Sequence, residues 1–401
     1  MSALASYRAL LSLTGPGYVL GTFLARLPLA MSQLGVLLLV SDSADSYGAG
    51  GASAGALAVA NGLTAPAWGA LADRIGQRPV LVAQSLGGAA GFAAILLLTD
   101  AGASWGWVAV ACAAAGVMMP QVGPMSRIRW RPIAAGHPRE DRLVQTAFSY
   151  EGAADEAAFV IGPALIGVGV SLLSPTAALV GAGVLLGVFG TWFALHPTAP
   201  PAHDRPASAG NDEPLWSLPL ALLCLSQLVI GTIFGSVQTG TSVLATAAGH
   251  PGATGFLHAL LGVGSVIAGL TVAALPDRFG LADRLRWFAL GLFLLSAPLL
   301  LVGSVLSLVP VLLVLGVSVA PYMITTFTLG EQITPPWRLA SVMTQLAAAT
   351  VLGYALGASI AGQVADLGGH RPAYAVTVAA AAVAVLVSWS GRRTLERARR
   401  P

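Results

Sequence analysis

Long apolar runs follow one another along almost the whole chain of 401 residues, separated by short polar turns. A run of roughly 20 apolar residues is long enough to cross a bilayer as a helix, and in hydrocarbon only a helix or a closed barrel satisfies its own backbone hydrogen bonds. The pattern therefore predicts an all-α membrane protein with twelve transmembrane helices. We place these spans near residues 12–40, 51–72, 79–99, 104–126, 143–172, 175–195, 215–247, 253–275, 284–303, 307–330, 338–366 and 372–390.

One polar stretch, residues 196–214, is longer than the other turns and divides the spans into two sets of six. It reads HPTAPPAHDRPASAGNDEP, and its five prolines and mixed charges are typical of a solvated linker. We therefore expect two pseudo-symmetric six-helix bundles joined by a cytoplasmic linker. The expected parts are an N-terminal bundle at 1–195, the linker at 196–214, a C-terminal bundle at 215–391 and a basic cytoplasmic tail at 392–401.

The composition agrees with a membrane protein, since 56% of the residues are hydrophobic and 9% are charged, against about 25% charged in soluble domains. All 20 basic residues are arginines, and only Arg26 and Arg371 lie outside the segments expected on one side of the membrane. This bias predicts a multi-pass protein of the cytoplasmic membrane with both termini in the cytoplasm. It also explains the basic charge without nucleic acid. The turns on the opposite side carry Asp42, Asp45, Asp100 and Asp366.

A charged turn, Gly69–Leu81, separates the second apolar run from the third and reads GALADRIGQRPVL. A weaker echo, Asp277 followed by Arg278, separates two runs of the second half. A charged turn repeated in each half indicates a duplicated membrane transporter. The turn resembles the signature loop of the major facilitator superfamily, G-x-x-x-D-R-x-G-R-R/K, with Gln77 replacing its first basic residue. The matching positions are Gly69, Asp73, Arg74, Gly76 and Arg78.

The resemblance implies that two six-helix halves rock about a substrate site near the middle of the membrane. It also implies that Asp73 latches the halves together on the cytoplasmic side and pairs with an arginine at the end of span 4, for which Arg127 and Arg129 are candidates. The alternative is that Arg74 and Arg78 only set the topology while Asp73 caps span 3. The residues that we assign to the latch are Gly69, Asp73, Arg74, Gly76, Arg78, Arg127, Asp277 and Arg278.

Three carboxylates, Glu151, Asp155 and Glu156, fall within six residues of the otherwise apolar span 5. A carboxylate at the middle of a membrane costs roughly 2.5–3.5 kcal/mol on insertion scales, so such residues usually face a cavity or a partner. Glu151 and Asp155 share one helix face, whereas Glu156 points about 100° further round. We predict proton coupling through these acids. The alternative is a structural network with Arg26, which is either an anchor for an anionic substrate or, as we favour, the counter-ion of the acids.

The same span contains Gly162, Pro163 and Gly167, which partly match the antiporter signature G-x-x-x-G-P-x-x-G-G of the superfamily. The resemblance implies close packing against span 8 and proton-driven export. The region Ala109–Pro124 carries no charge, although such antiporters usually have an arginine within span 4. The segment Ala320–Gln332, with the acids of span 5, resembles actinobacterial members of the superfamily, of the drug/proton antiporter-like kind.

Other polar and aromatic side chains within the spans are candidate substrate contacts, although each is also a common means of holding helices together. No phosphate-cradling glycine loop, catalytic triad or metal-binding pattern occurs in the sequence, so we expect neither an ATP-driven pump nor an enzyme, and no cofactor or metal. The candidate substrate contacts are Arg26, Gln121, Tyr150, Phe234, Gln238 and Tyr322.

Together these observations predict a monomeric secondary transporter that exports a small amphipathic organic molecule in exchange for protons, by alternating access. One alternative is uptake of a sugar or an organic acid by proton symport or facilitated diffusion. A second alternative, from another class, is a membrane partner protein that transports nothing.

Overall fold

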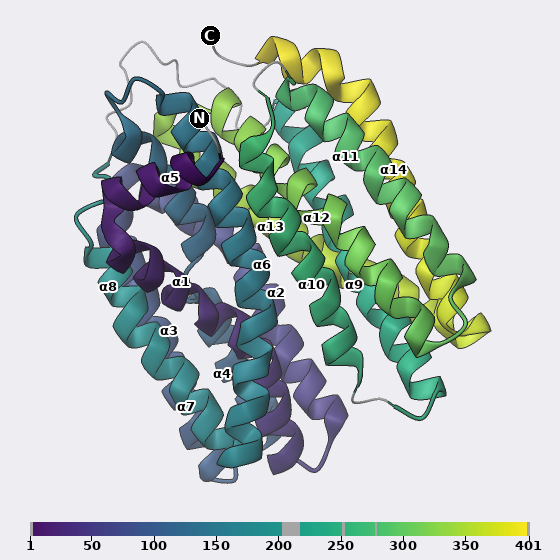
Figure 1. The fold of residues 1–401 in the computed structure, drawn as a ribbon. Helices are drawn as coiled ribbons and strands as arrows, with labels where there is room; N and C mark the ends of the chain where they lie inside the picture. The colour runs from purple at the N-terminus through teal and green to yellow at the C-terminus, as the bar shows by residue number, and fades with distance from the viewer. Residues whose placement is uncertain (1–2, 203–216, 251–252, 277–278, 399–401) are drawn as a thin grey trace.

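The computed structural model describes residues 3–202, 217–250, 253–276 and 279–398. Every regular element within these ranges is a helix. The helices form two bundles that lie side by side, as Figure 1 shows, with the chain beginning and ending at the same end of the molecule. The fold is therefore the two-bundle, all-α membrane architecture that the sequence predicts.

As described, the N-terminal bundle contains eight α-helices and one π-helical turn, because two of its membrane spans are divided. Helices α4 and α5 form one span interrupted at Met118–Gln121, where Pro120 lacks an N–H group and disfavours helical geometry at Met119. A π-helical turn, Leu186–Gly190, joins α7 to α8. The helices are α1 (Ala3–Ser43), α2 (Tyr47–Ile75), α3 (Gln77–Asp100), α4 (Trp105–Val117), α5 (Val122–Ala134), α6 (Glu140–Leu172), α7 (Pro175–Leu185) and α8 (Thr191–Leu195).

The C-terminal bundle contains six long helices. Short 3₁₀ turns extend α10 to Ala274 and α11 to Leu301. The helices are α9 (Leu218–Ala247), α10 (Ala253–Thr271), α11 (Leu281–Ser296), α12 (Val305–Ile333), α13 (Leu339–Gly368) and α14 (His370–Ala398).

Two long stretches without charged residues each contain a turn where the sequence predicts one. Ser174 caps α7 by accepting a hydrogen bond from the amide of Ala177, and Pro175 occupies the first turn of that helix. Ser304 caps α12 in the same way through the amide of Ser307. A serine side chain satisfies an amide that the helix itself leaves unpaired, so these short polar sequences end one span and begin the next.

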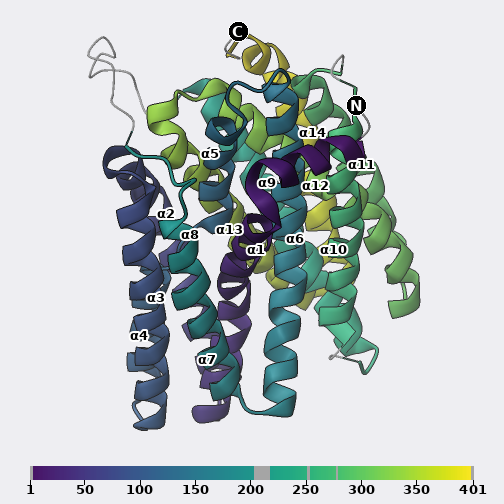
Figure 2. The ribbon, with the colours of Figure 1, turned by 60° about the vertical axis from the view of Figure 1, so that its left-hand side comes forward.

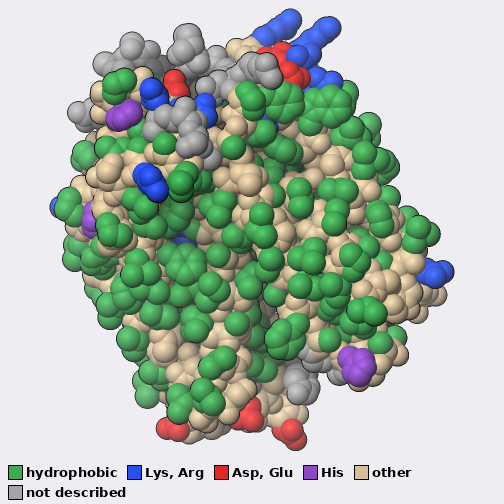
Figure 3. All heavy atoms as spheres, in the orientation of Figure 1, with side chains coloured by type: hydrophobic (Ala, Val, Ile, Leu, Met, Phe, Trp, Pro, Cys, Tyr) green, Lys and Arg blue, Asp and Glu red, His purple; other side chains and the backbone are tan. Residues whose placement is uncertain are grey.

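Eleven helical segments in the described part of the chain are long and apolar enough to cross a membrane. Helix α2, which is 29 residues long and packs against α4 and α13, accounts for the twelfth span. Figure 3 shows hydrophobic side chains around the middle of the molecule, most of the visible arginines together with some acidic side chains at one end, and further acidic side chains at the other end. We call the end where the chain begins and ends the terminal end.

The first helix is sharply bent at Gly15, whose φ of 76° lies in the left-handed region that favours glycine. The segment before the bend runs across the terminal end of the molecule, as Figure 2 shows. The Tyr7 hydroxyl in this segment donates a hydrogen bond of 2.8 Å to the carbonyl of Leu270 in α10. The start of the N-terminal bundle is thus tied to the C-terminal bundle.

Three boundaries differ from the sequence prediction. Span 4 continues through α5 to Ala134 rather than ending near residue 126. The expected tail at 392–401 is helical as far as Ala398, because Arg392 is ion-paired with Asp283 of α11 and with Glu396 one turn further on, each at 3.0 Å. Residues 196–202 of the expected linker pack on the N-terminal bundle, where the backbone N–H of Gln77 donates a hydrogen bond to the Pro200 carbonyl. Residues 203–214 lie outside the described ranges.

Candidate functional site

Four charged side chains from three helices meet inside the N-terminal bundle, and we call them the charge cluster: Arg26 of α1, Arg127 of α5, and Glu151 and Asp155 of α6. Arg26 is ion-paired with Glu151, and its Nε lies 3.4 Å from Asp155 Oδ1. Arg127 Nη2 lies 2.8 Å from Asp155 Oδ2. Because Glu151 and Asp155 are four residues apart on one helix, both arginines reach the same face of α6.

Glu151 is completely buried and has three donors. Besides Arg26, the Ser126 hydroxyl and the Trp130 indole N–H donate to Glu151 Oε1, at 2.7 and 2.6 Å. Ser126 and Trp130 are four residues apart on α5, so they too share a face. The charge of Glu151 is therefore compensated in place by Arg26, and also by Ser126 and Trp130, which the sequence analysis did not single out.

Asp155 has a more open environment than Glu151. Its side chain is 21% exposed, and its two oxygens pair with Arg26 and Arg127. Gly123 of α5 faces it: a Cβ atom at Gly123 would lie 2.6 Å from Asp155 Oδ1 and 3.2 Å from Arg127 Nη1. The absence of a side chain at Gly123 leaves room for a carboxylate at this position.

Glu156 lies outside the charge cluster. It is buried and turned toward α10 of the other bundle, where Ser265 is its polar neighbour. The sequence analysis named three acids as candidates for proton coupling. The structure brings Glu151 and Asp155 together with the arginines, whereas Glu156 faces the C-terminal bundle.

Arg127 is the main correction to the sequence analysis, which placed it at the cytoplasmic end of span 4 as a partner of Asp73. In the structure it is 2% exposed, pairs with Asp155, and stacks 4.3 Å from the ring centre of Phe327 in α12. The difference follows from the extra helical turns of α5, which carry Arg127 into the bundle. Span 4 therefore does contain a buried arginine, beyond the uncharged region Ala109–Pro124.

Besides the hydrogen bond of Tyr7, two sets of contacts between described residues join the bundles at the terminal end. The carboxylate of Asp73 accepts hydrogen bonds from the backbone amides of Ala340 and Ser341, at 2.9 and 2.8 Å, in the first turn of α13. Arg131 of α5 is ion-paired with Glu331 of α12, with a second hydrogen bond of 3.1 Å from Nη2 to Oε2. A carboxylate at a helix N-terminus is favoured by the helix dipole.

The other residues of the charged turn lie around Asp73. A Cβ atom at Gly69 would collide with Thr344 of α13, so this glycine allows the bundles to approach closely. Gly76 has a φ of 88° and forms the turn into α3, while Arg74 and Arg78 are exposed. The second copy of the turn, at Asp277 and Arg278, lies outside the described residues.

Arg129, the other candidate partner for Asp73, holds the start of the linker. Its guanidinium donates to Gln77 Oε1 at 3.0 Å, to the Phe193 carbonyl at 2.8 Å and to the Thr198 hydroxyl at 3.1 Å. His196 packs beside this network, where burial and then the charge of Arg129 lower its pKa. Arg129 therefore has a structural role inside the bundle.

The remaining candidate substrate contacts are largely engaged in packing. The Gln121 amide donates to Asn61 Oδ1 at 2.7 Å, and Tyr150 donates to the Val19 carbonyl at 3.1 Å. Gln238 accepts a hydrogen bond of 2.8 Å from Tyr354. Tyr322 is completely buried and Phe234 is half-buried, both within the apolar core.

The glycines of α6 pack differently from the prediction. A Cβ atom at Gly162 would lie 2.7 Å from Ala30 of α1, so this glycine admits α1 rather than α10, the eighth span. No atom of the described residues lies within 4 Å of such a Cβ at Gly167. The close contact between α6 and α10 lies elsewhere, where Val160 faces Gly262.

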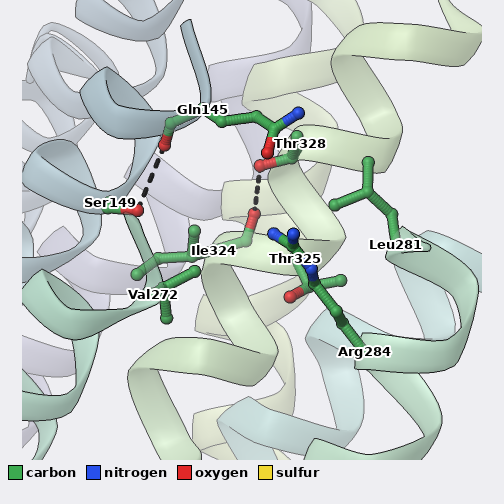
Figure 4. Close-up of a pocket in the computed structure, with 8 residues that line it drawn as sticks. All are labelled: Gln145, Ser149, Val272, Leu281, Arg284, Ile324, Thr325 and Thr328. Atoms are coloured by element: carbon green, nitrogen blue, oxygen red, sulfur yellow. Dashed lines mark hydrogen bonds between the residues drawn. The ribbon is translucent and has the colours of Figure 1, made fainter. Parts of the chain in front are cut away.

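A small polar cavity lies between the bundles, lined by α6 on one side and by α11 and α12 on the other (Figure 4). Its volume of about 10 Å³ is room for roughly one water molecule. In this conformation the cavity is therefore too small to hold an organic substrate. The Ser149 and Thr328 hydroxyls donate to the carbonyls of Gln145 and Ile324 in their own helices. In the described part of the chain, no group of three or more His, Cys, Asp or Glu side chains could hold a metal ion.

Comparison with known proteins agrees with this architecture. The human organic anion transporter MFSD10 (TETRAN) is 18% identical, with a TM-score of 0.73 over 94% of this chain and 99% of that chain. A bacterial homologue of the iron transporter ferroportin, in an outward-facing state, is 17% identical, with a TM-score of 0.74 over 93% of this chain and 98% of that chain. The E. coli fucose:proton symporter FucP is 15% identical, with a TM-score of 0.65 over 93% of this chain and 99% of that chain.

At these identities the structural likeness extends to the fold alone, and no curated protein matches the chain. The sequence profile of the Major Facilitator Superfamily, however, matches residues 18–344, which is most of the chain. The chain therefore belongs to the Major Facilitator Superfamily, and it is a transporter rather than an enzyme.

Proposed function

We propose that this transporter couples the movement of a small organic molecule to protons by alternating access, and that Asp155 binds the proton. The observation that carries the proposal is the position of Asp155: two arginines share it, and it is more exposed than Glu151 or Glu156. A proton on Asp155 would weaken its contacts with Arg26 and Arg127 at once. One protonation would thus change how α1, α5 and α6 are held together, which provides a two-state element.

We further propose that the terminal end faces the cytoplasm and that the protein works as a monomer in the cytoplasmic membrane. The support is the concentration of arginines at that end. In this orientation the contacts of Asp73 and Glu331 close the cytoplasmic side. Protons would then reach Asp155 from outside the cell.

Export of an amphipathic molecule in exchange for protons is the direction that we propose first. It is supported by the partial antiporter signature at Gly162 and Pro163 and by the resemblance to antiporter-like members. A second candidate is uptake of an organic acid together with protons. This candidate is favoured by Arg127, which gives the site a second buried guanidinium group. An organic anion transporter and a fucose:proton symporter share the fold.

Proteoliposomes with a pH-sensitive dye trapped inside would test the proposal. Cationic, neutral and anionic organic compounds are added in turn, and the internal pH is followed. We expect a compound-dependent pH change with the wild type and none with Asp155→Asn. When the compound moves inward, symport acidifies the interior of the liposome, whereas exchange makes it more alkaline. The same pH change in both proteins would remove Asp155 from the coupling mechanism.

A further inference from the structure

We propose that the substrate is a small organic anion whose carboxylate takes the place of the Asp155 carboxylate between Arg26 and Arg127. The inference rests on the proposed proton binding at Asp155 and names the substrate class of that site. It is carried by the unfilled hydrogen-bonding capacity of the two arginines and by the space around Asp155.

Both guanidinium groups are more than nine-tenths buried, and both keep unused donors. Among the described residues, Nε and Nη1 of Arg26 and Nε and Nη1 of Arg127 have no hydrogen-bond partner. Buried polar groups in proteins are nearly always hydrogen-bonded, and those that are not call for an explanation. Three donors without a partner around one carboxylate, besides Arg26 Nε at 3.4 Å from Asp155 Oδ1, indicate a site for a further anionic ligand.

The site has the shape that a carboxylate needs. Gly123 leaves room for a carboxylate next to Arg127 Nη1, which the Asp155 carboxylate occupies here, and the Phe327 ring covers one face of the Arg127 guanidinium. An arginine approached in its own plane binds a carboxylate through two parallel hydrogen bonds. Glu151 does not compete, because Ser126 and Trp130 hold it in addition to Arg26.

Charge balance then links the anion to the proton. With Asp155 ionised, the charge cluster contains two guanidinium groups and two carboxylates. A proton on Asp155 leaves two guanidinium groups facing Glu151 alone, and an unpaired buried charge is strongly unfavourable. One substrate carboxylate restores the balance. Proton and anion are therefore bound together, as in the second candidate of the proposed function, uptake of an organic acid with protons, and one cycle with a monocarboxylate moves no net charge.

Acetate is the probe that tests this site, with acetamide as its neutral isostere. In the Asp155→Ala protein we expect acetate to raise the thermal unfolding midpoint saturably, by about 2–4 °C, and acetamide to have no such effect. Asp155→Asn, which is uncharged like the protonated side chain, should respond to acetate as well, and independently of pH. In the wild type the acetate effect should appear at acidic pH and disappear at alkaline pH.

Asp283→Ala is the matched control, because Asp283 also pairs with two arginines, Arg286 and Arg392, but at the surface; acetate should not stabilise it. Equal effects of acetate and acetamide on Asp155→Ala would overturn the proposal. If that variant does not fold, an acetate effect on the wild type that is independent of pH would do the same. If a proton gradient drives flux but acetate has no effect, the anionic substrate is rejected and proton coupling at Asp155 is retained. If acetate stabilises the protein but no gradient drives flux, proton coupling is rejected and the anion site is retained.

Discussion

The two bundles differ in the chemistry at their centres. In the N-terminal bundle, α1, α5 and α6 bring two arginines into contact with two carboxylates. In the C-terminal bundle, α9 and α10 as described contain no Asp, Glu, Lys or Arg, and the acids of α12 and α13 lie at helix ends. Apart from the ion pair of Arg392 with Asp283 at the ends of α14 and α11, its described interhelical contacts between side chains are neutral: Gln227 with Thr350, Ser236 with Thr377, Gln238 with Tyr354, and Thr241 with Tyr374.

The packing differs in the same sense. Where α9 meets α13, glycines allow the two backbones to touch: a Cβ atom at Gly231, Gly235, Gly353 or Gly357 would collide with a backbone oxygen of the facing helix. Such contacts are short-ranged and do not depend on protonation. If Asp155 binds the proton as proposed, the N-terminal bundle changes its charge during transport, whereas the contacts between α9 and α13 of the C-terminal bundle stay neutral and closely packed.

The largest effect is expected from removing one arginine of the charge cluster. Arg127→Met leaves Asp155 with Arg26 alone, and breaking a buried pair by removing one partner costs about 3–5 kcal/mol. In the double variant Arg127→Met/Asp155→Leu, most of this stability should return, because no unpaired charge remains. Thermal unfolding in detergent measures both. Equal destabilisation of the single and double variants would show that Arg127 acts by packing on Phe327 rather than by its charge.

The neutral bundle should respond to volume instead. Gly353→Ala places a methyl group against the Leu228 carbonyl, and we expect a loss of about 1–3 kcal/mol because overpacking forces the two helices apart. Gly362→Ala, in the same helix, is the matched control: no described atom lies within 4 Å of its added Cβ. Unfolding midpoints of the two variants should differ accordingly. If they agree, the close approach of α9 and α13 does not contribute to stability.

The contact between the bundles can be loosened at Glu331. In Glu331→Gln the ion pair with Arg131 is lost, and hydrogen bonds to charged groups contribute about 1.5–3 kcal/mol, so we expect roughly a tenfold rise in opening at the terminal end. A cysteine placed at Gln145, with Cys112 and Cys224 replaced by alanine, reports opening by its rate of alkylation. Glu140→Gln is the control, because Glu140 pairs with Arg131 at 3.3 Å within one bundle. Equal rates in both variants would exclude Glu331 as a bundle contact.

Much of the fold could be predicted from the sequence, because hydrophobic length and turn chemistry are local. The turns at Ser174 and Ser304 were found in this way. The acids of α6 and Arg26 also stood out, since a charge in a long apolar run is conspicuous without any knowledge of its partners.

Arg127 was misplaced because its partners are distant in sequence. The three arginines at 127, 129 and 131 lower the local hydropathy and suggest the end of a span. In the folded protein their charges are compensated by Asp155, by the Phe193 carbonyl and by Glu331, which belong to three other helices. The nearby Ser126 and Trp130 were the available signal, since they place donors on α5 in the stretch before Ala134.

The smallest effect, and the sharpest check on the comparison, concerns the neutral pair of Tyr354 and Gln238. Tyr354→Phe removes one hydrogen bond of 2.8 Å, which should cost about 0.5–1.5 kcal/mol. Tyr374→Phe, which loses a longer contact of 3.3 Å with Thr241, should cost less. Neither change alters a charge, so the pH dependence of transport, measured with the trapped dye, should stay as in the wild type. A shifted pH dependence in Tyr354→Phe alone would mean that Gln238 takes part in coupling, and the division between a charged and a neutral bundle would then fail.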